Sequence, residues 1–301
     1  MAMRYIAAII GQSNELGTGV VSDFTPAWGF PQRDPVKPNG GSLRSMWPYL
    51  SELMGRRNVW LAVHNTGVGS TSAAHSWCGY IRAWASSMLV IKGSYALSGG
   101  KTWLCTAAST TINASTVTPA AGLQADGVTW SDLGTSAATD TVGICGPTHP
   151  KFDPNGYVAA AYAGLSGAVG FDEKWAFISI GQTDKSMNVV SADYAQALKN
   201  LTDYMLARSV KVAIGFTCAG NTAGLEAWYQ AELLPGYATA LAFYSGNANV
   251  KAGANLRTAL GPLTTSPGSG PGLQADNLHM NDAAYSLASE AWRDALVAAG
   301  W

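Results

Sequence analysis

Apolar runs of four to seven residues recur along the chain, and each ends at glycine or at polar residues. The runs are rich in β-branched side chains and nearly free of charge, which is typical of strands buried on both faces of a parallel sheet. They predict strands at residues 5–10, 58–63, 174–180 and 210–216, and a last short strand from Leu241 to Tyr244.

Between these runs, apolar residues recur at helical spacing. The spacing predicts a helix at residues 43–54, capped by Gly41-Ser42, and helices at 155–169, 192–207 and 223–234. A closing helix, capped by Asn281 or Asp282, is predicted to run to about Val297. Strands that alternate with helices indicate a parallel sheet with helices on both faces. We therefore expect an α/β protein.

The pattern changes in the segment 90–143, which is rich in Ala, Ser, Thr and Gly, nearly uncharged and without helical periodicity. Short apolar pieces at 101–105 and 126–130 predict strands joined by turns. We expect a small β-rich module at 90–143, inserted into an α/β domain formed by residues 1–89 and 144–301. A long ordered loop is the alternative.

Composition excludes several classes of protein. Of the 301 residues 48% are hydrophobic and 12% are charged, and the net charge is −1, which argues against binding to nucleic acid. No apolar run approaches the roughly 18 residues of a membrane span, and the first strand begins too early for a cleaved signal peptide. We expect a soluble protein without a membrane segment.

The cysteines do not have metal-ligand spacing, so the sequence predicts neither a metal nor another cofactor. Buried thiols are the simpler interpretation, and one disulfide is the alternative. The four are Cys78, Cys105, Cys145 and Cys218.

A candidate nucleophile, Ser13, follows the first strand, at the edge where α/β sheets bind ligands. A serine hydroxyl needs a base, and a histidine held by a carboxylate supplies one at neutral pH. Asp276 and His279 stand three residues apart near the other end of the chain. Backbone N–H groups of Ser13 and Gly69, with one side-chain donor, would complete an oxyanion hole.

Four short sequence blocks, taken together, indicate a family. They are Gly11-Gln12-Ser13-Asn14, the glycine turn from Gly67 to Ser72, Gly181-Gln182-Thr183-Asp184, and Asp276-x-x-His279. In this order they resemble the SGNH (GDSL-like) hydrolases, and Gly-Gln-Ser-Asn is similar to the branch of sialate O-acetylesterases and acetyl xylan esterases. The resemblance implies a flavodoxin-like, three-layer α/β/α sandwich and metal-free ester hydrolysis. It makes Ser13 the nucleophile, His279 the base, Asp276 its orienting acid and Gly69 an oxyanion donor.

The third block departs from the family pattern, because Thr183 stands where an asparagine usually donates to the oxyanion. Gln182 or Thr183 must supply that bond, and we favour Gln182. Loss of one such donor costs about 10²–10³-fold in other enzymes, so modest activity is consistent with this block. Asp184 is expected to be a structural hydrogen-bonding residue rather than a catalytic acid.

The sequence thus predicts a serine esterase that removes short acyl groups, acetyl above all, from carbohydrates. Segment 90–143 is faintly similar to small β modules of phage tail proteins, which suggests a virion-associated esterase acting on host sugars. The alternative is a carbohydrate-binding tail or adhesin protein whose esterase site has decayed. An esterase acting on lipids or peptidoglycan shares the chemistry, and the sequence leaves the sugar and the oligomeric state open.

Overall fold

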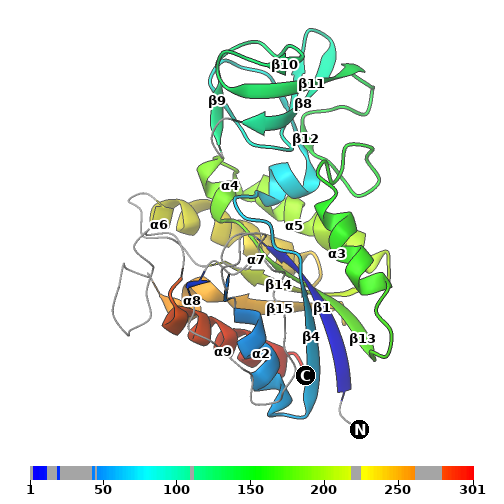
Figure 1. Ribbon diagram of the computed structural model, residues 1–301, viewed down its shortest axis with the longest axis vertical. Coiled ribbons are helices and arrows are strands. Elements are labelled where there is room, and N and C mark those ends of the chain that lie inside the picture. Colours follow the sequence, from blue (N-terminus) through cyan, green and yellow to red (C-terminus); the bar gives the residue numbers. More distant parts are fainter. Residues whose placement is uncertain are drawn as a thin grey trace.

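A computed structural model describes residues 3–11, 19–20, 43–44, 46–108, 112–217, 225–261 and 280–301. Five parallel strands form its central sheet in the order β15-β14-β13-β1-β4 (Figure 1). The order corresponds to 2-1-3-4-5, the flavodoxin-like order, so the α/β prediction is confirmed. The strands are β1 (Met3–Gly11), β4 (Val59–Asn65), β13 (Glu173–Ser179), β14 (Lys211–Phe216) and β15 (Val250–Asn255).

Helices cover both faces of this sheet and complete three layers. On β1, the odd-numbered residues from Tyr5 to Ile9 contact one group of helices, and the even-numbered residues from Ile6 to Ile10 contact the other. Every strand residue in these runs is buried, as expected for a parallel sheet. The first group contains α2 (Met46–Gly55), α8 (Leu256–Leu260) and α9 (Asp282–Ala298), and the second contains α3 (Tyr157–Ser166), α5 (Ser191–Leu206) and α7 (Leu234–Ala242).

Helix α9 runs antiparallel to the strands. The ring of Trp301, just beyond its end, lies 4.1 Å from the ring of Tyr5 and 4.9 Å from that of Trp175, near the starts of β1 and β13. Trp292, inside α9, stacks on Phe177 further along β13. The N-terminus of α9, capped by the Asn281 side chain as predicted, therefore lies toward the carboxyl ends of the strands.

The predicted strand from Leu241 to Tyr244 is wrong. Helix α7 continues to Ala242, and the last strand is β15. Tyr237, Ala240, Leu241 and Tyr244 all contact the core, and this spacing is that of a helix face rather than a strand. A short apolar run does not distinguish the two by itself. Upstream, the predicted helix at 223–234 is divided into α6 (Leu225–Trp228) and the π-helix η2 (Tyr229–Leu233).

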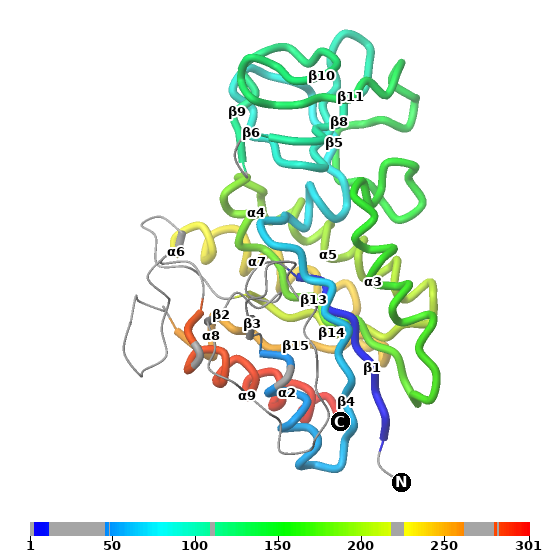
Figure 2. The backbone as a smooth tube through the Cα atoms, in the orientation of Figure 1, coloured from blue at the N-terminus to red at the C-terminus, as the bar shows by residue number. Residues whose placement is uncertain are grey.

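A second, mixed sheet forms a β-rich part at one end of the molecule (Figure 2). Its core consists of Val90, Ala96, Trp103, Cys105, Val128 and Trp130. Six strands pair in the order β10-β11-β8-β7-β5-β12, and β6 (Met88–Val90) pairs with β9 (Asn113–Ser115). The six are β5 (Tyr80–Ala83), β7 (Tyr95–Ser98), β8 (Lys101–Ala108), β10 (Gly122–Leu123), β11 (Val128–Thr135) and β12 (Gly143–Ile144). The strands thus begin before the expected segment 90–143 and end just after it.

The chain enters and leaves the β-rich part at neighbouring positions. Tyr80 pairs with Ile144 in the antiparallel β5–β12 pair, and the Cys145 N–H donates to the Gly79 carbonyl at 2.9 Å. Cys78, Cys105 and Cys145 are buried free thiols, and Cys218 lies outside the described residues.

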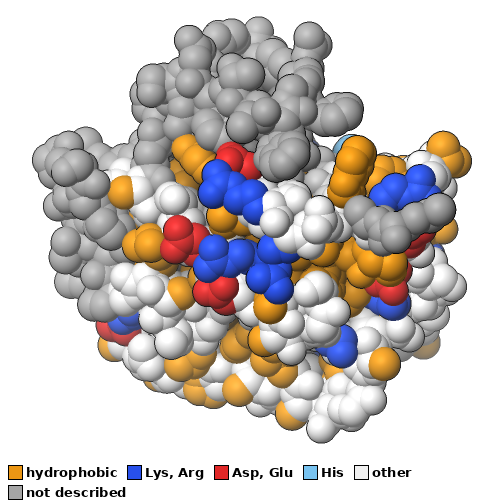
Figure 3. Space-filling model, turned by 90° about the horizontal axis from the view of Figure 1, so that it is seen from below, with side chains coloured by type: hydrophobic (Ala, Val, Ile, Leu, Met, Phe, Trp, Pro, Cys, Tyr) orange, Lys and Arg blue, Asp and Glu red, His pale blue; other side chains and the backbone are white. Residues whose placement is uncertain are grey.

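The opposite end of the molecule is an ordinary charged surface, on which basic and acidic side chains lie next to each other (Figure 3). Arg4 pairs with Asp172 and Lys211 pairs with Glu173 at the starts of the strands. Exposed pairs of this kind contribute about 0–1 kcal/mol each, so these two ion pairs add little to stability. No helix in the described ranges is both long and apolar enough to span a membrane.

Close packing of α9 on the sheet yields a stability prediction. A Cβ atom on Gly215 would lie 2.6 Å from the Trp292 ring and 2.9 Å from the Ala254 carbonyl oxygen. Gly215→Ala should therefore lower the free energy of unfolding by about 1–3 kcal/mol, as overpacked cores do. Urea denaturation measures the change. Gly55→Ala is the control, because a Cβ there meets nothing within 4 Å; an equal loss in both variants would contradict the packing argument.

Candidate active site

The candidate site lies where the strand order reverses, between β1 and β13. In open α/β sheets this switch point, at the carboxyl ends of the strands, is where ligands bind. Gly11, the last residue of β1, pairs with Ser179, the last residue of β13. The first and third sequence blocks therefore begin from neighbouring positions.

The segment after β4 crosses over the end of β1. The Thr66 hydroxyl donates to the Ile9 carbonyl at 2.5 Å, and the Val68 N–H donates to the Gly11 carbonyl at 3.0 Å. Gly69 follows directly and is partly exposed. Its N–H has no hydrogen-bond partner among the residues that the structure describes. The second block is thus fixed to the end of the strand that leads to Ser13.

The turn beyond Gly69 is tightly constrained. Ser70 has a left-handed backbone with φ of 58°, which is uncommon outside glycine. The Thr71 hydroxyl donates to the Val68 carbonyl at 2.7 Å and accepts from the Trp77 indole at 2.9 Å. Trp77 is fully buried, so it is a core residue.

The third block forms a short helix, α4 (Gln182–Ser186), directly after Gly181. Gly181 has φ of 149°, and a Cβ there would lie 2.7 Å from the Tyr194 hydroxyl, which donates to the Ile180 carbonyl. The turn therefore requires glycine. Gln182 is buried and Thr183 is partly exposed, both on the first turn of α4.

A buried carboxylate joins the second block to the third. Asp184 accepts hydrogen bonds from the Ser72 hydroxyl at 2.6 Å, the Ala73 N–H at 2.8 Å and the Ala74 N–H at 3.0 Å. Burial raises the pKa of Asp184, and these donors oppose that rise. Asp184 thus makes structural hydrogen bonds, as the sequence predicted. Its partners, however, are Ser72 at the end of the second block and the next two residues, Ala73 and Ala74, and the sequence analysis did not identify them. A local signal was the serine directly before a short helical segment.

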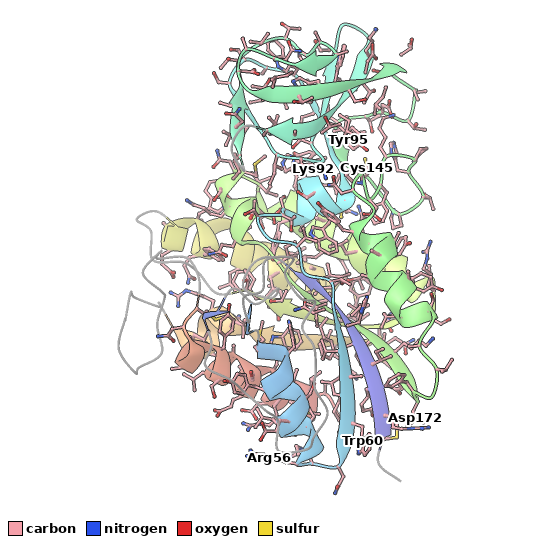
Figure 4. The ribbon with its side chains drawn as sticks, viewed as in Figure 1. Arg56, Trp60, Lys92, Tyr95, Cys145 and Asp172 are labelled. Carbon is pink, nitrogen blue, oxygen red and sulfur yellow. The ribbon has the colours of Figure 1, made fainter. Side chains whose placement is uncertain are left out.

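That segment is a π-helix, η1 (Ala73–Cys78), buried throughout. π-Helical turns are rare and are frequent at functional sites. His75 in η1 is fully buried, with its Nδ1 atom 2.9 Å from the Ser94 hydroxyl and its ring 5.1 Å from that of Tyr80. His75 is thus a structural residue at the junction with the β-rich part. Lys92, Tyr95 and Cys145 lie at the same junction, whereas Arg56, Trp60 and Asp172 lie at the far end of the molecule (Figure 4).

The structure therefore brings Gly69, Gln182 and Thr183 to the carboxyl edge of the sheet, on the two loops that Asp184 joins. Ser13, Asp276 and His279 lie outside the described residues. Along the sequence, the nearest described residue to Ser13 is Gly11, and the nearest to Asp276 and His279 is Met280. Within the described ranges, no three His, Cys, Asp or Glu side chains are grouped so that they could hold a metal ion.

No protein-family model matches the chain, and no curated protein matches it. Among solved structures, a crystal structure of NanS is similar over 99% of this chain and 97% of that chain, with a TM-score of 0.44 and 12% sequence identity. The assignment of function therefore rests on the residues of this chain.

Burial of His75 predicts a loss of stability in acid. Desolvation, helped by the positive charge of Arg82, holds the pKa of His75 well below 6.5. Below about pH 6.5 the unfolded chain therefore binds a proton that the folded chain does not bind, and stability falls as the pH falls. The limiting slope for one such group is about 1.4 kcal/mol per pH unit.

Urea denaturation of the wild type and of His75→Gln between pH 7 and pH 5 tests this expectation. The variant should lose less stability than the wild type over that range, because it lacks the group that titrates on unfolding. Equal slopes for the two proteins would contradict it.

Proposed function

We propose that the chain is a serine esterase of the SGNH type, with Ser13 as its nucleophile. One observation carries the proposal: three separate segments meet at the end of β1, two residues before Ser13. The Val68 N–H bonds to Gly11, and Gly11 pairs with Ser179. In this proposal the two neighbouring segments supply the oxyanion donors for the nucleophile that follows this strand end.

The direction of α9 supports His279 and Asp276 as the other two catalytic residues. Met280 follows His279 directly and is fully buried, in the same core cluster as Ile9 of β1. Helix α9 begins two residues later, at the end that lies toward the carboxyl edge of the sheet. In this proposal the His279 imidazole takes the proton from Ser13, and Asp276 orients the ring and stabilises the imidazolium.

The reaction proceeds through an acyl-enzyme. The Ser13 oxygen attacks the ester carbonyl, and the protonated imidazole then gives its proton to the departing alcohol. Water repeats the sequence on the acyl group and releases the acid. The N–H groups of Ser13 and Gly69 stabilise the oxyanion, with Gln182 as the favoured third donor and Thr183 as its alternative.

For the substrate we propose short acyl esters, acetyl above all, on carbohydrates. The first block has the form typical of sugar O-acetylesterases, and this likeness is the support for the substrate class. The β-rich part would then lie beside the site, joined to it through η1. A carbohydrate-binding protein without turnover is the second candidate, and the altered third block favours it.

Ester hydrolysis tests the assignment. Ser13→Ala and His279→Ala should each reduce kcat for p-nitrophenyl acetate by several orders of magnitude, since triad members act as a unit, and Asp276→Ala should cost less. Turnover should also fall from acetate to butyrate to octanoate. Serine-independent turnover would exclude the mechanism, and glycan binding without any turnover would favour the second candidate.

The choice between the two side-chain donors is tested separately. Gln182→Ala should lower kcat by about 10²-fold with little change in KM, because an oxyanion donor acts mainly in the transition state. Thr183→Val, which removes a hydroxyl at nearly constant volume, should have a much smaller effect. The reverse order would assign the donor to Thr183.

A further inference from the structure

We propose that Asp184 is a positioning residue for the proposed oxyanion hole, acting through Ser72 and the first turn of η1. The inference rests on the proposed esterase function and goes beyond it, because Asp184 contacts no reacting atom in this scheme. Its carboxylate fixes the distance between the two loops that carry the oxyanion donors.

The hydrogen bonds around Asp184 all run toward its carboxylate, because the backbone N–H groups and the Ser72 hydroxyl can donate and an ionised carboxylate can only accept. The Ser72 oxygen accepts from the His75 N–H at 3.1 Å, and its single hydrogen is directed to Asp184 Oδ1. The same Oδ1 atom accepts from the Ala74 N–H, and Oδ2 accepts from the Ala73 N–H. Both carboxylate oxygens are therefore occupied by donors from one three-residue stretch.

The two ends of this connection adjoin the two sides of the proposed oxyanion hole. Ser72 follows Gly69 by three residues, through the constrained turn at Ser70. On the other side, Asp184 lies in α4 beside Thr183 and two residues after Gln182. A shift of the carboxylate would thus change the separation of Gly69 from both candidate side-chain donors. Misplacement by about 1 Å is enough to cost roughly 10²-fold in rate.

The π-helix is also held from its other side, independently of Asp184. The Ser76 hydroxyl donates to the Lys92 carbonyl at 3.1 Å, and the Asn155 amide donates to the Ser76 carbonyl at 2.8 Å. His75 contacts Ser94 in the same region. Loss of one carboxylate oxygen should therefore displace the first turn of η1 while the rest of the helix stays in place.

Asp184→Asn tests the role, because the amide is nearly isosteric with the carboxylate but keeps only one acceptor oxygen. Its NH₂ group takes the place of the other oxygen and cannot accept a hydrogen bond from the donors there. On p-nitrophenyl acetate, kcat should fall about 10²-fold with KM within about threefold of wild type. Ser72→Ala removes one of the three bonds to Asp184, together with the acceptor of the His75 N–H, and should lower kcat less. Ser72→Thr retains the hydroxyl and should keep most of the wild-type kcat.

Asp153→Asn is the matched control. Asp153 is less buried than Asp184, but its carboxylate likewise accepts two backbone N–H bonds, from Val158 and Ala159 at the start of α3. It should lose thermal stability without a change in kcat. If Asp184→Asn does not fold, the pair Ser72→Ala and Ser72→Thr provides the test.

Two failures can be told apart. A folded Asp184→Asn or Ser72→Ala protein with wild-type kcat, or one in which only KM changes, would overturn the positioning role and leave the esterase intact. A folded wild-type protein that hydrolyses no ester would overturn the esterase proposal, and this role with it. A selective fall in kcat that the control does not share supports both.

Discussion

The backbone N–H groups at the start of η1 impose the constraint on which the candidate site depends. They are buried, so water cannot satisfy them, and a helix start has no carbonyl partners of its own. The chain meets this need with the carboxylate of Asp184 in α4, at the cost of burying a charge-bearing group. The same bonds that satisfy η1 therefore hold the second and third blocks together at the end of β1.

Four of the five strands of the central sheet, and most helices, could be predicted from the sequence because their patterns are local; β15 was not predicted. A run such as residues 5–10 is apolar throughout, which suits a strand that contacts helices on both faces. The strand predicted at Leu241–Tyr244 was wrong because four consecutive apolar residues fit the period of a strand and that of a helix equally well. The core contacts of Tyr237 and Ala240, seen in the structure, show that this segment continues a helix face.

The sequence predicted at which edge of the sheet the candidate site lies and the order of its blocks along the chain. It did not predict the hydrogen bonds that join the blocks. The sequence showed that Gly69, Gln182 and Thr183 each follow a strand. Because the carboxyl ends of parallel strands share one edge of the sheet, these residues could be predicted to lie at that edge. The bond between Ser72 and Asp184 joins residues 112 apart in sequence, and no periodicity reports such a pair. The hydroxyl of Ser72 also caps η1, but a helix of six residues is too short to be predicted from the sequence pattern, so its cap was not predicted either.

The paired entry and exit of the β-rich part have a consequence for how this protein can change over evolution. Because Gly79 and Cys145 are already hydrogen-bonded to each other, the ends of the intervening chain stay together whatever its length. Loop-closure entropy grows only slowly with length, so insertions and deletions there would cost the parent sheet little. The fold thus separates the fixed packing around β1 from a region whose length can change without moving the strands of the central sheet.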